Sequence, residues 1–431
     1  MSRVSIVLCC ALTLGMAAPG SAQQQPAKLP LRTVAPAAAK APETVGAIRG
    51  LRHLPDGRVL VNDASRRRLL LFDATLATYT VVIDSTPGAA NSYGRSSAPF
   101  FGYVGDSSIF VDYASQSLLI IDEKGKIARV TSPPKPADLM YVQTGTPGMD
   151  AQGRMVYRTS IRQPIPTTAP TGLMMSSTPP DSAALVRADW DTGKVDTMAK
   201  IKVSSGSRMN MKTAPDGSRS YEMRMSLLTS TDDWTITTDG AIAIVRGQDY
   251  HIDWISGDGK ATASPKMPYD WRRLSDTDKQ GIVDSTRRMM DSLLAAQGGG
   301  LRSMSSVNGV TTTTVIPMKY EYAPISEMPD YYPPIRMGSV LADRDGNVWI
   351  LPYTSAQGQN KGLVYDVVDR KGDVMYRVQL PENRSIAGFG KGGIIYMMAP
   401  APVANPTDRP GSAGFYLERT MLAAPGAESK Q

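Results

Sequence analysis

Four arginines lie on or just before the strands that the sequence predicts to be innermost in a repeated β-structure. They are Arg49, Arg52, Arg336 and Arg384. A guanidinium group binds a carboxylate, a phosphate or a sulfated glycan through paired hydrogen bonds, so four of them near one channel could hold an anionic ligand. The favoured alternative is that they pair with turn aspartates or lie solvated on the outer rim, as most surface arginines do.

A second set of charged residues ends the second predicted strand of successive repeats. Its members are Asp63, Asp112, Arg158 and Arg246, and Tyr113 and Tyr353 lie beside two of these strand ends. Equivalent positions of a ring of repeats are related by rotation, so these side chains should share one face around the channel mouth. Ion pairs between repeats are the favoured role, and a polar ligand site is the open alternative.

Catalytic and metal-binding patterns are sparse. The two histidines, His53 and His251, lie in different repeats, and no Ser–His–Asp or HExxH spacing is present, so His53 is interpreted as a structural or turn residue and His251 as a packing residue. An aspartate or glutamate could still act as a general base. The inner strands carry few oxygen ligands for a hard cation, the exceptions being Asp232, Asp233 and Asn383. No cofactor is therefore predicted, with Ca²⁺ as a weakly supported alternative.

Methionines alternate on the two arms of a predicted hairpin, at Met209 and Met211 and at Met223 and Met225, with Met174 and Met175 nearby in the sequence. Thioether groups clustered in this way could hold Cu(I). Packing of irregular loops is the usual role of methionine and is the favoured interpretation.

The elements that would position these residues are short strands separated by Gly-containing turns. One glycine marks the first turn of each predicted repeat, and these are Gly57, Gly105, Gly153, Gly240, Gly346 and Gly392. Three of the five intervals are nearly equal, and the two longer ones contain insertions, as repeat proteins allow in their loops. Four strands in about forty residues is the size of one propeller blade.

The sequence therefore predicts an all-β protein, a six-bladed β-propeller of four-stranded blades with one β-hairpin insertion and one helical insertion. Five or seven blades are the alternatives. The expected organisation is a signal peptide over 1–22, a disordered Pro/Ala-rich lead-in over 23–44, the propeller over 45–422 with insertions at about 160–181, 204–229 and 269–327, and a disordered tail over 423–431. The helical insertion is predicted over Ser275–Ala296, with Ser275 as the N-cap. A segment within Leu29–Val34 could pair with the last blade and close the ring.

Residues 1–22 have the pattern of a secretory signal. Arg3 precedes the apolar run Val4–Met16, and Gly20–Ser21–Ala22 is a small-residue cleavage site, so export is expected with Gln23 as the first mature residue. Both cysteines lie in this segment, which excludes disulfides and cysteine chemistry from the mature chain. No later segment is long and apolar enough to span a membrane. The formal charge of +7 is mild for 431 residues, and no Lys/Arg-rich block predicts nucleic-acid binding.

The strand–turn–strand units LPDGRVLVNDAS, MDAQGRMVYRTS, TTDGAIAIVRG and LADRDGNVWILPYTS carry a family resemblance. With these units the chain resembles bacterial secreted six-bladed propellers of the NHL-like and TolB-like kind from Val45 to about Leu422. The resemblance implies the architecture and leaves function open, because such folds serve lactonases, lyases and receptor modules. The leading hypothesis is a non-enzymatic binding or scaffold protein that recognises a protein, peptide or glycan through one face of the ring. The alternative is a lactonase-like hydrolase or lyase with its substrate in the central channel. No oligomeric state is predicted.

Overall fold

The structure is a computed structural model of the 431-residue chain. It describes residues 29–86, 92–94, 98–113, 115–132, 139, 142, 146–159, 175–177, 180–203, 208–296, 298–307, 310–356, 362–403 and 413–423. The predicted signal peptide and the predicted tail, apart from Ala423, lie outside the described residues.

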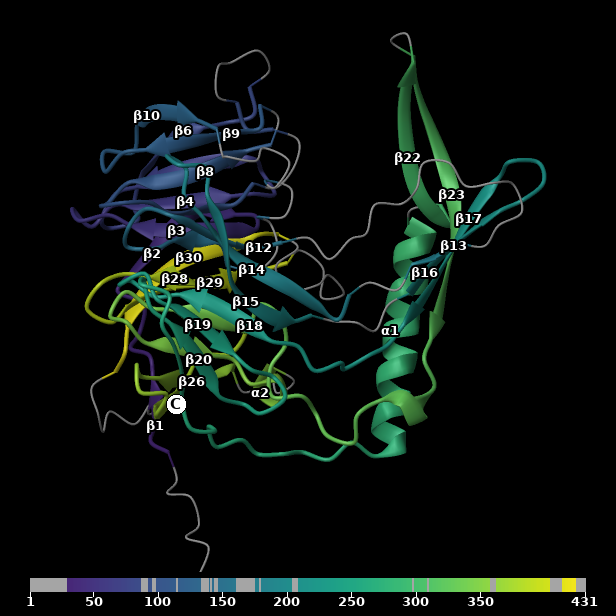
Figure 1. Ribbon diagram of the computed structural model, residues 1–431. Coiled ribbons are helices and arrows are strands. Elements are labelled where there is room, and N and C mark those ends of the chain that lie inside the picture. The colour runs from purple at the N-terminus through teal and green to yellow at the C-terminus, as the bar shows by residue number, and fades with distance from the viewer. Residues whose placement is uncertain are drawn as a thin grey trace, which may run out of the picture.

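Six antiparallel sheets of the described chain repeat one four-stranded pattern (Figure 1). The first contains β3 (Ile48–His53), β4 (Val59–Asp63), β5 (Arg68–Phe72) and β6 (Tyr79–Ile83). The second contains β7 (Phe100–Gly102), β8 (Ser108–Asp112), β9 (Ser117–Ile121) and β10 (Ile127–Thr131). The third contains β11 (Gly148–Met149), β12 (Met155–Arg158), β14 (Ser182–Ala188) and β15 (Val195–Lys202).

The remaining three sheets follow the same order. The fourth contains β18 (Asp233–Ile236), β19 (Ile242–Val245), β20 (Ile252–Ile255) and β21 (Ala261–Ala263). The fifth contains β24 (Val340–Ala342), β25 (Val348–Ile350), β26 (Val364–Val368) and β27 (Val374–Gln379). The sixth contains β28 (Ser385–Phe389), β29 (Ile394–Pro400) and β30 (Phe415–Met421). In the fifth sheet, the short helix α2 (Tyr353–Ala356) follows β25. Each predicted turn glycine thus lies between the first two strands of one sheet.

Six buried apolar clusters lie between successive sheets. The first joins sheets one and two through residues such as Leu69 and Phe110, and the next four join sheets two to six in order. The sixth cluster brings Tyr396 and Leu417 of the last sheet against Val59 of the first. The series of contacts therefore returns to its start, which is the arrangement of a β-propeller. The innermost strands meet near the centre, where β3 contacts both β7 and β28.

The turn between the first two strands depends on glycine in all six sheets. The six predicted glycines have φ between +67° and +93°, a left-handed conformation that is costly for residues with a Cβ atom. Gly57 and Gly240 follow an aspartate in Asp–Gly turns, where the aspartate side chain accepts backbone N–H groups. These turns all lie at one end of the ring, called the turn end below.

The N-terminal segment closes the last sheet. Strand β2 (Ala39–Val45) pairs with β30 as its fourth strand, and β1 (Leu31–Thr33) pairs in parallel with β27 of the fifth sheet. The prediction of a disordered lead-in over 23–44 is therefore wrong for these strands. The Leu29–Val34 segment pairs with the fifth sheet through Leu31–Thr33, and Val34 bridges Leu422, the residue after β30, so it also meets the last sheet as predicted. Few residues of β2 are apolar, but Ala41 and Val45 are fully buried, so docking rather than composition orders the strand.

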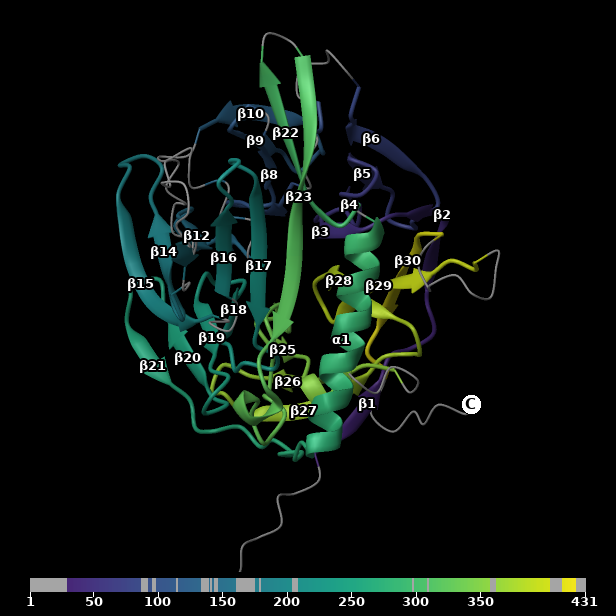
Figure 2. The same cartoon turned by 90° about the vertical axis from the view of Figure 1, so that its right-hand side faces the viewer.

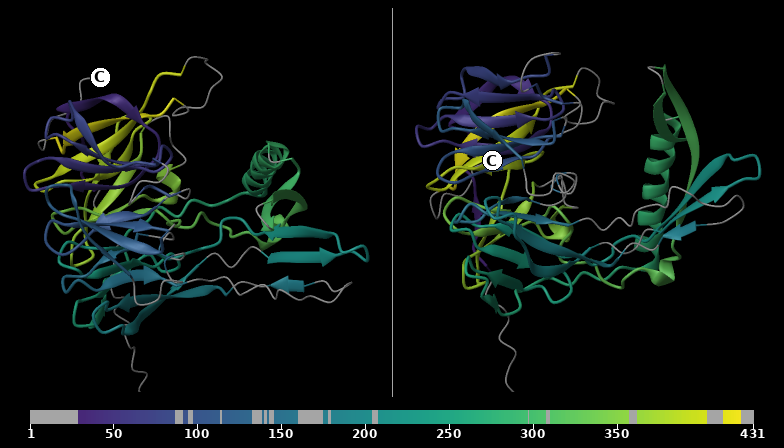
Figure 3. Two further views of the ribbon diagram at one scale, coloured as in Figure 1. Left: turned by 90° about the horizontal axis from the view of Figure 1, so that it is seen from above. Right: turned by 45° about the horizontal axis from the view of Figure 1, so that its top comes forward.

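The insertions together form one further sheet with a helix, called the module below. Its strands are β13 (Met175–Ser177), β16 (Arg208–Thr213), β17 (Arg219–Met225), β22 (Gly300–Val307) and β23 (Val310–Tyr322), in the order β13-β16-β17-β23-β22. A short 3₁₀ turn (Ile325–Glu327) follows β23. The hairpin and the helix were predicted as separate insertions, and the parallel pairing of β17 with β23 unites them. The module stands off one side of the ring (Figures 1 and 3), and Figure 2 views the ring from that side.

Helix α1 (Asp276–Ala296) confirms the predicted helix and its start. The Ser275 Oγ accepts the Asp278 backbone N–H at 3.1 Å, and Asp278 Oδ2 accepts the Ser275 N–H at 3.0 Å, which is a capping box. The apolar side chains of the helix are only partly buried, because Met289 and Leu293 are 52% and 47% exposed. No helix in the described part of the chain is long and apolar enough to cross a membrane.

Candidate ligand site at the turn end of the ring

Arg52 is a buried cation near the end of the innermost strand of the first sheet. It is 7% exposed and lies across Gly102 of β7, where a Cβ atom would come within 2.7 Å of the guanidinium. Its hydrogen bonds are long, 3.4 Å from Nε to Ser108 Oγ and 3.4 Å from Nη2 to the Ser107 carbonyl. The absent side chain at Gly102 thus makes room for this arginine between sheets one and two.

Arg344 brings a second cation to the same region. It follows β24 in the first turn of the fifth sheet, and its charge lowers the pKa of Arg52. Burial is the largest cause, and together they lower that pKa to about 10, while Asp106 acts in the opposite sense. Burial also lowers the pKa of Arg344 itself, again opposed by Asp106. Neither arginine forms an ion pair within the residues that the structure describes.

His53 lies next to Arg52 and faces the sixth sheet. Its Nδ1 is 2.8 Å from the hydroxyl oxygen of Tyr396, a fully buried residue of β29. Burial lowers the pKa of His53, and the charges of Arg344 and Arg419 lower it further, so the imidazole is neutral near pH 7. Burial raises the pKa of the Tyr396 hydroxyl to about 12, so the tyrosine stays protonated.

These groups together can bind an anion and move a proton. Two guanidinium groups without carboxylate partners suit a carboxylate or phosphate, and a neutral imidazole beside them is suited to accept a proton. Asp106 is the nearby acid whose charge reaches both arginines. We call Arg52, Arg344, His53 and Asp106 the turn-end site.

Three of the predicted site residues are held in ion pairs at the other end of the strands. Arg246 lies 2.7 Å from both Asp232 and Asp253, and Arg384 pairs with Glu418 at 3.3 Å. Each pair lies within one sheet, whereas ion pairs between repeats were the favoured role for Arg246 and turn aspartates were the expected partners of Arg384. His251 is part of the same group, with Nε2 3.1 Å from Asp253 Oδ1.

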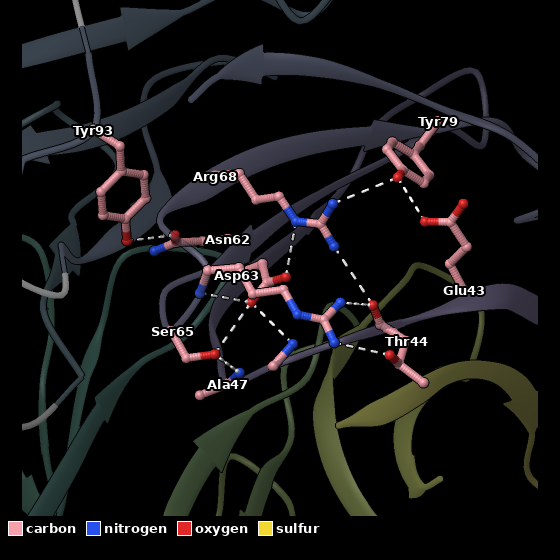
Figure 4. A network of polar contacts seen from close by, with 11 residues as sticks. Glu43, Thr44, Ala47, Asn62, Asp63, Ser65, Arg68, Tyr79 and Tyr93 are labelled. Atoms are coloured by element: carbon pink, nitrogen blue, oxygen red, sulfur yellow. Dashed lines mark hydrogen bonds and ion pairs between the residues drawn. The ribbon is translucent and has the colours of Figure 1, made fainter. Parts of the chain in front are cut away.

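Asp63 is the third of these residues and belongs to a structural network (Figure 4). Its carboxylate accepts the Gly46 N–H at 3.0 Å and pairs with Arg68 at 3.0 Å. Arg68 in turn reaches Tyr79, whose hydroxyl donates to Glu43 at 2.7 Å. The network therefore fastens the closing strand β2 to the first sheet, which favours a structural role for Asp63.

The remaining predicted residues are dispersed. Arg49 and Arg336 are exposed near the starts of β3 and β24, at the opposite end of these strands from Arg52. Asp112 is buried and accepts a hydrogen bond from Ser115. Arg158 is buried at the end of β12 and is considered separately below. The four arginines of the innermost strands do not form one cluster.

No group of three or more His, Cys, Asp or Glu side chains in the described residues could hold a metal ion. The carboxylate of Asp233 is already hydrogen-bonded to the backbone, since it accepts the Val340 N–H at 2.9 Å. Burial raises its pKa to about 7. In the strand register, Met209 of β16 lies opposite Met223 of β17, and Met175 of β13 lies opposite Met211 of β16. Met211 is 6% exposed, which suits packing.

Sequence reasoning missed Arg344 and the roles of His53 and Tyr396. Arg344 occupies a turn between two aspartates, DRDG, where a solvated role is the ordinary expectation. Its proximity to Arg52 follows only from ring closure, since the two residues lie in the fifth and first sheets. Gly102 was the one local signal of the site, because its missing side chain leaves room for the Arg52 guanidinium.

No family model and no curated protein matches the sequence. Among solved structures, the chain is similar to virginiamycin B lyase from Staphylococcus aureus, with 12% identity, a TM-score of 0.38, and coverage of 89% of this chain and 98% of that one. It is also similar to the calcium-binding protein regucalcin from Agrobacterium tumefaciens, with 11% identity, a TM-score of 0.40, and coverage of 91% and 96%. A gluconolactonase from Xanthomonas campestris matches with 9% identity, a TM-score of 0.37, and coverage of 88% and 87%. These neighbours include more enzymes than binding proteins, and similarity at this level does not transfer their chemistry to this chain.

Proposed function

We propose that the protein binds a small organic anion with a carboxylate or phosphate group at the turn-end site, and that Arg52 and Arg344 are its cationic anchors. The observation that carries the proposal is the absence of an ion pair for either arginine within the described residues, although each is substantially buried. By contrast, Arg68, Arg246 and Arg377 of the same ring all pair with aspartates.

Burial of an unpaired guanidinium is costly, because the group loses water and gains no opposite charge. Arg52 has only two long hydrogen bonds as compensation, and the neighbouring charge of Arg344 adds repulsion. An anion between Arg52 and Arg344 would offset both the cost of burial and the repulsion between the two charges, and it would accept bidentate hydrogen bonds. The turn-end site is thus suited to an anion more than to a neutral sugar or a peptide face.

A second candidate function is catalysis at the same site, of the lyase or hydrolase kind. It is favoured by the neutral imidazole of His53, held through Nδ1 by Tyr396 and placed beside the cationic anchors. Such an imidazole could remove a proton from a carbon next to the bound carboxylate, while the arginines stabilise the negative charge that develops. Recognition of a protein, peptide or glycan through one face remains the broader alternative, and no contact described above selects it.

The test is thermal unfolding and calorimetric titration with citrate, succinate and inorganic phosphate, against sodium chloride at equal ionic strength. A ligand at a hundredfold excess over its dissociation constant should stabilise the native state by about 2.7 kcal/mol. Arg52→Gln and Arg344→Gln should each weaken binding tenfold or more, while Arg288→Gln, on the exposed side of α1, should not. Equal responses of all three variants would reject the site.

Catalysis is separated from binding by His53→Gln. This variant should keep anion affinity and lose turnover of any substrate found by screening carboxylates for product formation. If it loses affinity and turnover equally, His53 serves binding and the lyase or hydrolase candidate fails.

We further infer that the six sheets are the six blades of one ring in the NHL-like and TolB-like manner, and that the chain is exported. The closed series of apolar clusters supports the blade count. The sequence of residues 1–22 supports export, and mass spectrometry of protein recovered outside the cytoplasm should find Gln23 as the first residue.

A further inference from the structure

Arg158 is a buried arginine at the end of the ring that faces the module. It is the last residue of β12 in the third sheet, and it is 5% exposed. Two other sheets approach it there: its Nη1 is 3.7 Å from the Met337 sulfur before β24, and its pKa is influenced by the charge of Asp233 at the start of β18. The guanidinium therefore lies where the third, fourth and fifth sheets meet.

The guanidinium has no oxygen acceptor in the part of the chain that the structure describes. Its Nε is buried without a hydrogen-bond partner, and Met337 provides only a weak sulfur contact. No carboxylate of the described residues comes within ion-pair distance of it. On the neighbouring strand β14 the residue opposite Arg158 is Leu185, an apolar side chain.

Arg246 provides the comparison within the same molecule. It follows β19 in the fourth sheet, one residue beyond Val245, which is the position that corresponds to Arg158 in the third, and it has two carboxylates at 2.7 Å. One is Asp253 of the adjacent strand, and the other is Asp232. An arginine at this end of the fourth sheet is thus held by carboxylates, whereas Arg158 in the third sheet has no such pair among the described residues.

Asp233 does not take the role of a partner. Its carboxylate accepts the Val340 N–H at 2.9 Å. Burial raises its pKa, and hydrogen bonds from the backbone N–H groups of Val340, Trp234, Ser339 and Gly338 oppose that rise. Its charge raises the pKa of Arg158, but burial of Arg158 is the larger effect and lowers it. The carboxylate is therefore oriented toward the backbone of the chain that enters β24.

The guanidinium is nevertheless reachable from the module side. Met337, whose sulfur it contacts, is 40% exposed, and its neighbour Arg336 is exposed as well. Burial raises the pKa of Tyr353 and of Tyr365, and the charge of Arg336 opposes that rise, so this second cation acts on the same end of the fifth sheet. A methionine side chain is flexible and can move aside for a polar ligand.

We propose that Arg158 anchors a second oxyanion site, at the module-facing end of the ring, in which a carboxylate or phosphate oxygen replaces the Met337 sulfur as its acceptor. Arg336 adds positive charge at the entrance. This site lies at the opposite end of the strands from Arg52 and does not depend on the turn-end site.

The experiment measures anion binding in the Arg52→Gln, Arg344→Gln double variant, so that the turn-end site does not contribute. Calorimetry and thermal unfolding use sodium acetate and inorganic phosphate as separate probes, with sodium chloride at equal ionic strength as the reference. One or both probes should bind and raise the unfolding midpoint. Acetate alone would identify a carboxylate ligand, and phosphate alone a phosphorylated one.

Arg158→Met in that background replaces the unpaired charge with an apolar side chain of similar length. It should leave the midpoint in chloride unchanged or raised, because no ion pair is lost, and it should weaken anion binding tenfold or more. Arg158→Gln provides a second variant that keeps polarity, and it should also lose the response. Arg246→Met is the matched control, which should lower the midpoint in chloride because two carboxylates lose their partner.

Three results would overturn the proposal, and the first two concern anion binding. One is the absence of any response to acetate and phosphate in the double variant. The other is an unchanged response after loss of Arg158. A large fall of the midpoint for both Arg158 variants in chloride would also overturn it, since the guanidinium would then serve the fold and not a ligand.

Discussion

Replacement of Val45 by alanine tests whether the N-terminal strand truly closes the ring. Val45 of β2 is 1% exposed and packs with Val59 and Leu417 in the cluster between the sixth and first sheets. The substitution removes two buried methyl groups, worth about 0.8 kcal/mol each, and leaves a small cavity. We expect the free energy of unfolding to fall by about 1.5–2.5 kcal/mol.

The assay is equilibrium unfolding in urea, with the slope of the transition compared between variants. Val81→Ala is the matched control, because it makes the same chemical change on the outer strand β6, where Val81 is 50% exposed. It should change the free energy of unfolding by less than about 0.5 kcal/mol. If Val45→Ala and Val81→Ala prove equally mild, β2 is not docked on β30, and the composition of residues 23–44 was the better guide.

Three further predictions concern a turn, a buried acid and metals. Gly240→Ala should lower the free energy of unfolding clearly more than Gly193→Ala does. Both glycines have positive φ, a conformation that costs a residue with a Cβ atom about 1–2 kcal/mol, but only at Gly240 would the new Cβ lie 2.2 Å from a backbone nitrogen. Burial raises the pKa of Asp233 from 3.8 to about 7 in the folded protein. Between these two pH values the unfolded chain loses the proton while the folded protein keeps it, so the free energy of unfolding is highest below about pH 4 and falls as the pH rises to 7. Relative to Asp233→Asn, the wild type should therefore lose up to about 4 kcal/mol between pH 4 and pH 8, measured by urea unfolding, and a flat difference would mean an ordinary pKa. EDTA and added Ca²⁺ should leave the thermal midpoint unchanged, because the described residues contain no cluster of metal ligands, and a drop in EDTA would contradict this.

Much of the ring could be predicted because its signals are local. Turns such as Pro55–Gly57 and Asp343–Gly346 are recognisable from their residue types, and the short apolar runs between such turns have the length of blade strands. Strand β2 could not be predicted, since its sequence AKAPETV acquires a partner only from the far end of the chain. The module sheet was missed for the same reason, because β17 pairs with β23 in parallel across a long interval.

In the candidate site, too, single residues could be predicted from local sequence, but contacts between distant residues could not. Arg52 was recognisable as a cation on an innermost strand, whereas its association with Arg344 depends on how six sheets close around a centre. Arg158 and Arg246 were indistinguishable as strand-ending arginines. They differ in their neighbours, since Leu185 of β14 lies opposite Arg158, whereas Arg246 pairs with Asp232 and Asp253.

The module is joined to the ring by three excursions of the chain, after β12, after β15 and after β21, each of which returns to the ring. The last excursion leaves and returns as a paired ribbon, in which Arg273 bridges Tyr331 and the Leu274 N–H donates to the Asp330 carbonyl at 2.8 Å. A domain on one linker can swing about a single hinge, whereas a body held by several tethers has few independent motions. Any movement of the module would therefore strain the third, fourth and fifth sheets together. These are the sheets that surround Arg158, so the orientation of the module and the mouth of the ring are mechanically coupled.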